Sequence, residues 1–286
     1  AVGLKMLPKH VANAHLKGDI HFHDLDYMPF SPYTNCCLPD FEHMLRDGYK
    51  MGNADIEPPK SVGTATSQIS QLIANISSAQ YGGVSVDRID ELLEPYVRLD
   101  EVKARAQADK WIGDPRKSDR FVEETVKKNV YDAMQALEYE INTLQTSNGQ
   151  TPFVSIGFGL GSSKEARWVQ QAILDVRRKG LGKEGRTAIF PKLLFTLKRG
   201  LNLDPGDPNY DIKQKAIACA TERMYPDVLN YDKIVELTGS FKAAMGCRSF
   251  LQSWTNENGE DVSSGRMNLG VVTLNLPRVA MEARGD

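Results

Sequence analysis

The sequence predicts an α/β fold, in which short strands alternate with helices. Residues 153–158 and 192–197 are apolar runs of strand length, and the segment 163–179 between them has the character of a helix. Strands separated by helices of this length indicate crossover connections, which are typical of α/β proteins.

Two longer amphipathic helices are expected in the first half of the chain. Residues 61–79 carry apolar side chains at helical spacing, and Gly82 and Gly83 end the pattern. Residues 120–146 carry an apolar stripe, which comprises Val122, Val126, Val130, Met134, Leu137 and Ile141. Further helices are expected over 4–17, 87–110 (one or two helices) and 210–224, and further strands over 20–23 and 271–275.

Composition places the chain among ordinary globular proteins. Of its 286 residues, 41% are hydrophobic and 25% charged, which permits a large core in one large or two small domains. The formal charge of −2 gives no reason to expect binding to DNA or RNA. No apolar run has transmembrane length and no signal peptide is expected, so no membrane partner is expected either. Four cysteines do not form a disulfide framework in a chain of this size, which favours a reduced, cytoplasmic location.

The stretch around Cys247 carries the strongest indication of chemistry. Cys247 follows Gly246 in the sequence Met-Gly-Cys-Arg-Ser-Phe-Leu, and a glycine lets the backbone turn sharply and present the next side chain. No second cysteine lies at a spacing typical of a metal site or a CxxC motif. Cys247 is therefore either a packing residue, as free cysteines commonly are, or a reactive thiol.

Other motifs accompany Cys247 along the chain. They are Gly-Asp-Ile-His-Phe-His-Asp-Leu-Asp-Tyr at 18–27, Thr-Asn-Cys-Cys-Leu at 34–38, Ser-Asn-Gly-Gln-Thr-Pro-Phe at 147–153, Phe-Pro-Lys-Leu at 190–193, Arg-Met-Tyr-Pro-Asp at 223–227 and Gly-Arg-Met-Asn-Leu-Gly-Val-Val-Thr-Leu-Asn-Leu-Pro at 265–277. In order and spacing this series closely resembles the N-terminal and central part of the anaerobic (class III) ribonucleoside-triphosphate reductases, a family of glycyl-radical enzymes. The resemblance extends from about residue 19 to residue 280.

The resemblance implies part of a ten-stranded α/β barrel, with Cys247 on a finger loop inside it. The helices at 61–79 and 120–146 would lie outside the barrel at a dimer interface. Residues 1–286 would form a partial catalytic barrel domain, namely its first half and the finger loop. The C-terminal half, with the glycyl-radical loop and a zinc site, would be absent, as would the N-terminal nucleotide-binding cone of many members. Either the sequence is a piece of a longer protein, or it assembles with a separate C-terminal half.

The implied activity is anaerobic reduction of ribonucleoside triphosphates to 2′-deoxyribonucleoside triphosphates by thiyl-radical chemistry, with formate as the reductant. The glycyl radical and the zinc would belong to the absent C-terminal part, and no metal is expected in this chain. Implied partners are deoxynucleotide or ATP effectors, a second copy in a homodimer, and a radical-SAM iron–sulfur activase. The fragment alone is expected to be inactive. Two alternatives are a non-catalytic fragment that binds nucleotides and dimerises, and another glycyl-radical enzyme of the formate-lyase type.

Two cysteines carry the implied chemistry. Cys247 matches the residue that becomes a thiyl radical and abstracts the 3′ hydrogen of the ribose. Cys36 matches the second active-site cysteine, which donates a proton or hydrogen atom where the 2′ hydroxyl leaves. Because neighbouring residues of a strand point to opposite faces, Cys37 is then expected in the core. The competing interpretation is that all three are packing residues.

Three further residues are implied at the active site, of which Asn268 matches the family's catalytic asparagine. Asn268 would orient the 3′ hydroxyl, because an amide hydrogen-bonds well but is a poor general base. His21 would lie near the ribose hydroxyls, and Ser249 would add a hydroxyl contact. Asn268 is alternatively a turn residue. The side chains that could instead form a metal site are His21, His23, Asp24 and Asp26.

Gln71, Lys103 and Glu140 match the specificity-effector site that the family has at its dimer interface. Lys103 would contact phosphate, while Gln71 and Glu140 would contact the base or the sugar. Without the resemblance, all three would be ordinary solvated positions on helices.

Overall fold

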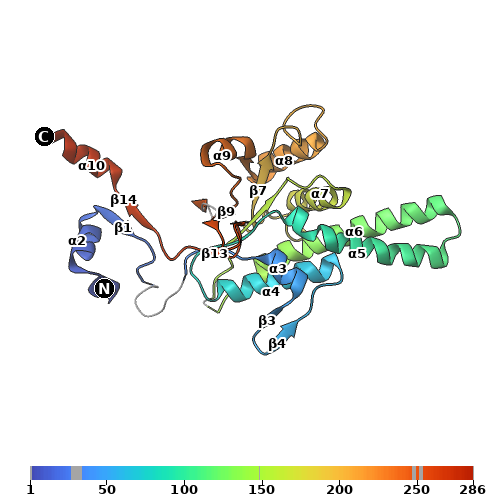
Figure 1. The fold of residues 1–286 in the computed structure, drawn as a ribbon, viewed down its shortest axis with the longest axis horizontal. Coiled ribbons are helices and arrows are strands. Elements are labelled where there is room, and N and C mark those ends of the chain that lie inside the picture. The colour runs from blue at the N-terminus through green and yellow to red at the C-terminus, as the bar shows by residue number, and fades with distance from the viewer. Residues whose placement is uncertain (1, 27–33, 148, 247–248, 251–253, 286) are drawn as a thin grey trace.

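A computed structural model of the chain describes residues 2–26, 34–147, 149–246, 249–250 and 254–285. Its centre is a six-stranded mixed sheet in the order β13-β2-β5-β6-β7-β8 (Figure 1). The strands are β13 (Arg266–Met267), β2 (Cys37–Leu38), β5 (Val84–Val86), β6 (Val154–Phe158), β7 (Lys192–Leu197) and β8 (Asp227–Asn230). Strands β2, β5, β6, β7 and β8 run parallel, and β13 is antiparallel to β2. The α/β prediction is therefore confirmed.

Helices join the parallel strands, because parallel neighbours need crossover connections. The helices of this layer are α4 (Val62–Ser77), α5 (Ile89–Trp111), α6 (Pro115–Thr143), α7 (Lys164–Lys179) and α8 (Tyr210–Arg223). Val84 and Val86 of β5, with Val154 and Ile156 of β6, form a hydrophobic core with residues of these helices. One face of the sheet is thus apolar and covered by helices.

Side chains at the intervening positions of β5 and β6 point to the other face. Ser85 and Ser155 occupy these positions and are register partners on the two parallel strands. Both are small, polar and buried. This face receives the segment that contains β9 (Ala244–Met245), which packs against β5 and β6.

Capping side chains set the starts of three helices. Ser61, Asp114 and Ser163 are the N-cap residues of α4, α6 and α7, and each accepts a backbone N–H of the first helical turn. Pro115 follows Asp114 at a position where a missing N–H breaks no helical hydrogen bond. The sequence placed the starts of α4 and α7 within one residue, whereas α6 begins five residues before the predicted start at 120.

The apolar stripe of α6 is buried inside the chain. Its members are at most 5% exposed; they are Val122, Val126, Val130, Met134, Leu137 and Ile141. The reason is that α4, α5 and α7 all pack against α6. This stripe is therefore not available for contact with a second copy, and the dimer interface expected for this helix would have to use its other residues.

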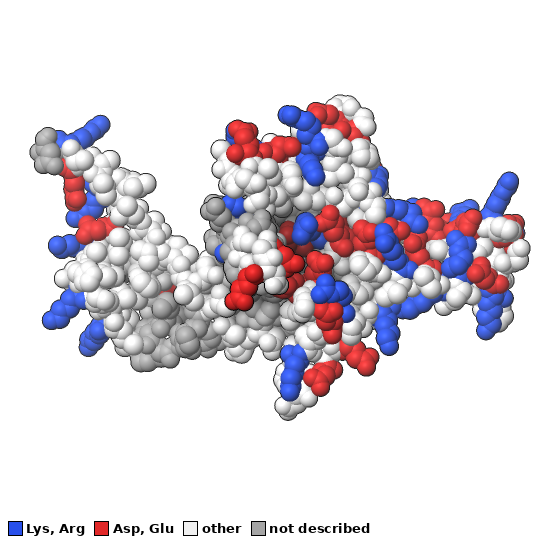
Figure 2. Space-filling view, viewed as in Figure 1, with Lys and Arg blue, Asp and Glu red and all other residues white. Residues whose placement is uncertain are grey.

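Helices α5 and α6 form a hairpin that extends beyond the sheet (Figure 1). Acidic and basic side chains alternate over its surface (Figure 2). Several form pairs one helical turn apart, such as Arg120 with Glu124 at 2.7 Å between Nε and Oε1. Exposed pairs of this kind contribute little to stability, so this end of the hairpin is a solvated surface.

The two ends of the chain pair with each other away from the six-stranded sheet (Figure 1). Strand β1 (Ile20–Phe22) is antiparallel to β14 (Val272–Leu274), and the flanking helices are α2 (Lys9–Lys17) and α10 (Leu276–Glu282). We refer to residues 2–26 and 271–285 as the arm. The helix predicted over 4–17 is split into α1 (Val2–Met6) and α2, because Pro8 lacks the N–H that a continuous helix needs.

Several short elements complete the described part of the chain. They are α3 (Phe41–Asp47), β3 (Tyr49–Met51), β4 (Ala54–Ile56), α9 (Tyr231–Thr238), β10 (Ser249–Phe250), β11 (Trp254–Thr255), β12 (Asp261–Val262) and a 3₁₀ helix at Ala283–Gly285. Strands β3 and β4 form an antiparallel pair, as do β11 and β12. The sequence did not predict these elements, since most have too few residues to establish a hydrophobic period.

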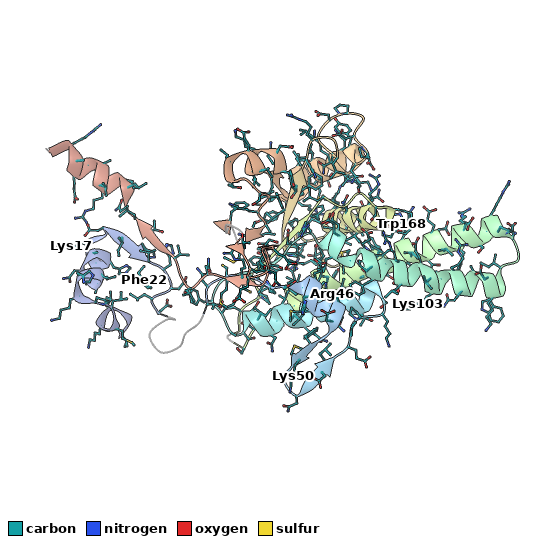
Figure 3. All side chains as sticks on the ribbon, viewed as in Figure 1. Lys17, Phe22, Arg46, Lys50, Lys103 and Trp168 are labelled. Carbon is teal, nitrogen blue, oxygen red and sulfur yellow. The ribbon has the colours of Figure 1, made fainter. Side chains whose placement is uncertain are left out.

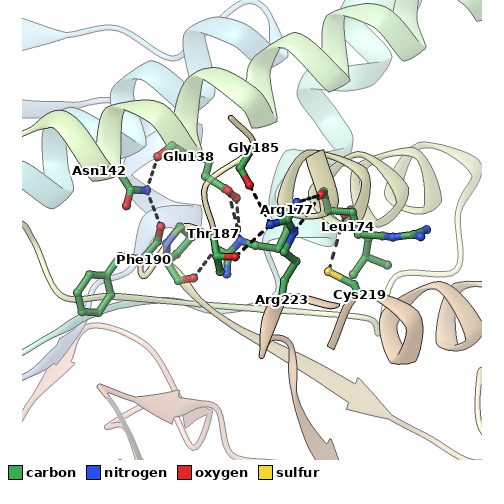
Figure 4. Close-up of polar contacts among 11 residues, drawn as sticks. Glu138, Asn142, Leu174, Arg177, Gly185, Thr187, Phe190, Cys219 and Arg223 are labelled. Atoms are coloured by element: carbon green, nitrogen blue, oxygen red, sulfur yellow. Dashed lines mark hydrogen bonds and ion pairs between the residues drawn. The ribbon is translucent and has the colours of Figure 1, made fainter. Parts of the chain in front are cut away.

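A buried ion pair joins α6 to α7 (Figure 4). Arg177 is fully buried; its Nε lies 3.3 Å from the Glu138 carboxylate, and its Nη2 donates to the Pro191 carbonyl at 2.6 Å. Burial raises the pKa of Glu138, and the charge and hydrogen bond of Arg177 oppose that rise. Asn142 of α6 also donates to the Phe190 carbonyl. These contacts fix the chain before β7 to the helix layer.

Candidate active site

The Cys36 thiol lies against the backbone of Gly246. A Cβ atom placed on Gly246 would be 2.6 Å from the Cys36 Sγ, so only a glycine allows this approach. The Cys36 Sγ accepts a hydrogen bond from the Gly83 N–H at 3.2 Å and donates one to the Asn35 Oδ1 at 3.4 Å. Cys247, the next residue in the sequence, lies outside the described residues.

Cys37 has a different environment from Cys36. It lies in β2 and packs, partly buried, against the hydrophobic core. Burial, with a smaller contribution from the neighbouring Cys36, raises the pKa of Cys37 to about 12, and a hydrogen bond with Gln80 opposes the rise. The Cys37 thiol is therefore neutral at physiological pH, which suits a packing residue.

Asn268 is held beside Cys36 by the pairing of β13 with β2. The Cys36 N–H donates to the Asn268 Oδ1 at 2.6 Å, and the Asn268 N–H donates to the Cys36 carbonyl at 2.9 Å. The Asn35 N–H also donates to the Asn268 carbonyl at 2.9 Å. Two predicted residues 232 positions apart are thus brought together. Because Oδ1 is engaged with the backbone, Nδ2 is the group of Asn268 that could address a substrate hydroxyl.

Strands β9 and β10 flank the position of Cys247 in the sequence. They are antiparallel, with Ser249 opposite Met245. For Ser249, the structure describes the backbone alone. Gly246 has a left-handed φ of +66°, and hydroxyl groups of Ser85 and Ser155 contact its N–H and its carbonyl. These two serines lie outside every motif described above. The Val-Ser-Val and Val-Ser-Ile alternation indicates that they share one face of the sheet, but not that they contact Gly246.

His21 is not brought to the Cys36 contact. It lies in β1, in the arm, whose position is marked by the neighbouring Phe22 (Figure 3). Its ring is 4.4 Å from the ring of His23 and 5.3 Å from that of His15, between centroids. His23 Nε2 in turn is 2.8 Å from the Thr273 Oγ1. Among the described residues, no group of three or more histidine, cysteine or acidic side chains is arranged to hold a metal ion.

Gln71 and Glu140 line one open pocket of about 620 Å³. The pocket lies between α4, the end of α6 and the turn between β3 and β4, and its lining residues include Met51, Gly52, Ser67, Ser70, Ala74, Asn75 and Leu144. The Ser70 hydroxyl donates to Glu140. Two of the three predicted effector contacts therefore share a pocket.

Lys103 lies away from that pocket, near the start of α4 (Figure 3). Its Nζ donates to the Lys60 carbonyl and is 3.6 Å from the Asp100 Oδ1. Position 71 is about ten residues further along the helix, or roughly 15 Å at 1.5 Å per residue. Within one chain, Lys103 and Gln71 therefore do not address the same small ligand group.

A second cavity, of about 430 Å³, opens at the carboxyl ends of β2 and β5. Its charged lining residues include Asp40, Arg46, Asp87, Arg88 and Glu91. Arg88 pairs with Asp87 at 3.1 Å and with Glu91 at 3.3 Å. Burial raises the pKa of Asp87, and Arg88 opposes the rise. With Glu42 also in the lining, four carboxylates face two arginines, so the cavity is net acidic. It lies at the opposite end of β5 from the Cys36 contact.

No helix in the described part of the chain is long and apolar enough to cross a membrane.

A family model for anaerobic ribonucleoside-triphosphate reductase matches residues 1–286. The chain therefore belongs to this family, as the motif series predicted.

Two relatives show how much of such a protein the chain represents. The anaerobic ribonucleoside-triphosphate reductase of Escherichia coli (strain K12) is 57% identical over 282 residues, which are 98% of this chain and 39% of that protein. The corresponding protein of Enterobacteria phage T4 is 49% identical over 285 residues, which are 99% of this chain and 47% of that protein. The chain thus spans less than half the length of either relative.

Solved structures support the fold assignment. The crystal structure of the anaerobic ribonucleotide reductase from Thermotoga maritima with citrate in the active site matches with a TM-score of 0.62 at 18% identity, covering 99% of this chain and 50% of that one. A structure of the same enzyme in complex with dATP and CTP matches with a TM-score of 0.60 at 18% identity, covering 99% and 47%. At this identity the likeness concerns the fold, and it agrees with the prediction of a part of the family's barrel.

Proposed function

We propose that this chain is the N-terminal and central part of a catalytic subunit that reduces ribonucleoside triphosphates to 2′-deoxyribonucleoside triphosphates under anaerobic conditions. The observation that carries the proposal is the convergence of Cys36, Asn268 and Gly246 in a member of the reductase family. Residues 1–286 would be the first half of the barrel with the finger loop. The glycyl radical and the zinc site would reside on the remainder of the assembled protein, which works in the cytoplasm.

The chemistry assigns one role to each side chain. Cys247 would take the 3′ hydrogen atom of the ribose as a thiyl radical and later return a hydrogen atom. The Cys36 thiol would give a proton to the 2′ hydroxyl, which leaves as water. Formate would supply two electrons together with the hydrogen that replaces the 2′ hydroxyl, and would be oxidised to carbon dioxide. A proton from solvent would then restore the Cys36 thiol. Asn268 would orient the 3′ hydroxyl through Nδ2, and Ser249 would contact a substrate hydroxyl. His21 lies in the arm, so it would contact the substrate hydroxyls only if the assembled protein brings the arm toward Cys36.

The test uses the protein in its full natural length, activated by its iron–sulfur activase and assayed anaerobically with CTP and formate. Cys247→Ala should abolish dCTP formation while nucleotide binding persists. Cys219→Ala is the matched control, because Cys219 is buried in α8 and burial raises its pKa to about 11. Turnover of Cys247→Ala within tenfold of wild type would overturn the proposal, since about 1.4 kcal/mol is too little for loss of the hydrogen-abstracting group.

The pocket around Gln71 and Glu140 supports a second assignment, that of a regulatory nucleotide site. A structure of the Thermotoga maritima enzyme has dATP bound in a specificity site. We infer that a deoxynucleotide or ATP binds this pocket in a homodimer. Because Lys103 does not reach the pocket of its own chain, it would contact the nucleotide bound to the second copy.

A further inference from the structure

Gly246 is held at both of its backbone polar groups by serine side chains. Its N–H donates to the Ser85 Oγ at 2.7 Å, and its carbonyl accepts from the Ser155 Oγ at 3.1 Å. Ser85 is 1% exposed and Ser155 is 4% exposed, so water does not compete for these bonds. A buried serine hydroxyl or a buried backbone group without a partner is unfavourable. Each of the two bonds therefore satisfies a serine hydroxyl and a backbone group of Gly246 at once.

The two serines occupy matched positions on neighbouring strands. Ser85 of β5 and Ser155 of β6 are register partners in a parallel pair, so their side chains leave the same face of the sheet. Gly83 extends this face. A Cβ there would be 3.1 Å from the Phe153 carbonyl oxygen and 3.4 Å from the Gly246 Cα, so a larger residue would crowd the segment. The sheet thus provides a fixed two-point support for one residue, Gly246.

This support also determines what Gly246 approaches. On its remaining side Gly246 meets the Cys36 Sγ, whose own position is fixed by the Gly83 N–H. Cys36 is tied through its backbone to Asn268. The Ser85 and Ser155 hydroxyls therefore connect the rigid sheet to the place where Gly246 and Cys36 touch, one residue before Cys247.

We propose that Ser85 and Ser155 are positioning residues that clamp the Gly246 backbone and set where the chain enters residue 247 relative to the Cys36 thiol. The assignment rests on the proposed reductase function. Neither serine is assigned a contact with substrate; both act through Gly246. Misplacement of a reacting group by about 1 Å can cost on the order of a hundredfold in rate, so the clamp should affect turnover more than substrate binding.

The first measurement needs no turnover. In the full-length protein, hydrogen exchange should show the Gly246 amide protected in wild type and exposed in Ser85→Ala, which removes its acceptor. The amides of β5 and β6 should keep their protection. Ser77→Ala is the matched control, because Ser77 is buried in α4 and its hydroxyl has no hydrogen-bond partner among the described residues.

The second measurement is steady-state kinetics of the activated protein. Ser85→Ala and Ser155→Ala should each lower kcat on the order of ten- to a hundredfold, with KM for the nucleotide within about twofold of wild type. The double variant should be less impaired than the product of the two single effects, because both hydroxyls hold the same residue. Ser155→Thr, which keeps a hydroxyl, should recover much of the activity.

The outcomes separate the clamp from the function it rests on. If wild type reduces no ribonucleotide, the proposed function fails, while the exchange of the Gly246 amide still decides whether the clamp exists. If wild type is active and both alanine variants match Ser77→Ala, the clamp is wrong. Loss of protection throughout β5 and β6 in both variants would also overturn it, since the serines would then hold the sheet together rather than Gly246.

Discussion

At the scale of single residues, Gly246 combines two demands that only glycine meets together. Its φ of +66° lies in the left-handed region, and the Cys36 Sγ occupies the space where a side chain would begin. Gly239 has a comparable φ of +80° but has no atom within 4 Å of its Cβ position. Comparing the two glycines therefore distinguishes the cost of a left-handed backbone, which both share, from the steric conflict with Cys36, which only Gly246 has.

We expect Gly246→Ala to be much more damaging than Gly239→Ala. Each introduces a residue with a left-handed φ, which costs roughly 1–2 kcal/mol. Only Gly246→Ala also forces Cys36 or the clamped backbone to move, so it should lower reductase activity sharply in the full-length protein. Thermal unfolding and dCTP formation of both variants provide the comparison. Equal activity losses would show that the Cys36 contact is unimportant.

Cys37 should make stability depend on alkaline pH. Its folded-state pKa of about 12 is raised above the usual value of 9.0, so stability is fully present below pH 9. Between pH 9 and 12 the unfolded thiol ionises while the folded one stays protonated, which favours unfolding by up to about 1.4 kcal/mol per pH unit. Urea unfolding from pH 8 to 10.5 should therefore show a steeper decline for wild type than for Cys37→Ala. Parallel declines would mean that Cys37 is not desolvated.

The sequence predicted roles for Cys36, Cys247 and Asn268 because each lies in a short contiguous motif. It did not identify Ser85 and Ser155, since their significance comes from the register of two strands separated by the α5–α6 hairpin. A serine between two valines looks the same whether its hydroxyl meets water or a backbone carbonyl. Residue roles that depend on a partner far away in the sequence therefore required the structure.

At the scale of elements, hydrophobic periodicity predicted that α4, α6 and α7 exist, with the start of α6 placed five residues too late, but not what their faces contact. The stripe of α6 was a sound prediction of a buried face; its partners turned out to be α4, α5 and α7. Arg177 shows the same limit. A basic residue in the last turn of a helix is usually solvated and favourable near the helix C-terminus, yet Arg177 is fully buried against Glu138.

We expect Arg177→Met to lower the free energy of unfolding by about 3–5 kcal/mol, because it leaves the Glu138 carboxylate buried without its partner. Arg177→Met combined with Glu138→Leu should recover most of this loss, since both charges are then removed. The neighbouring Arg178→Met serves as the control and should have little effect, because its pair with Glu222 is solvent-exposed. Urea denaturation measures all three. A double variant as unstable as Arg177→Met would argue that lost packing, not the unpaired charge, is the cause.

At the scale of the whole molecule, the arm is the part least integrated with the six-stranded sheet (Figure 1). Val272, Leu274, Leu276 and Met281 are all at least 54% exposed there, which is unusual for apolar side chains lying close together in sequence. His21 lies in the same arm. We therefore expect another part of the assembled protein to pack against these apolar side chains of the arm. The sequence predicted the strands of the arm but not that they lie away from Cys36. The sequence of a short strand does not indicate which other strand it pairs with.

The proposed effector site depends on how two copies of the chain assemble, because Lys103 does not reach the pocket of Gln71 and Glu140 in its own chain. If Lys103 contacts a nucleotide phosphate in a dimer, Lys103→Ala should weaken dATP binding by roughly ten- to a hundredfold, equivalent to about 1.5–3 kcal/mol for a charged hydrogen bond. Gln71→Ala should weaken it as well. Lys110→Ala, on the same helix, is the matched control.

A mixed dimer tests whether the two residues act across the interface. Suppose that one copy carries Gln71→Ala and the other Lys103→Ala. If each site uses Gln71 from one copy and Lys103 from its partner, one of the two sites has both defects and the other has none. Titration with dATP should then show half of the sites at wild-type affinity. If both residues served a site within the same chain, every site would carry one defect and no site would regain that affinity. Sedimentation of the mixture establishes that dimers are present, and a monomer at all concentrations would reject the shared site.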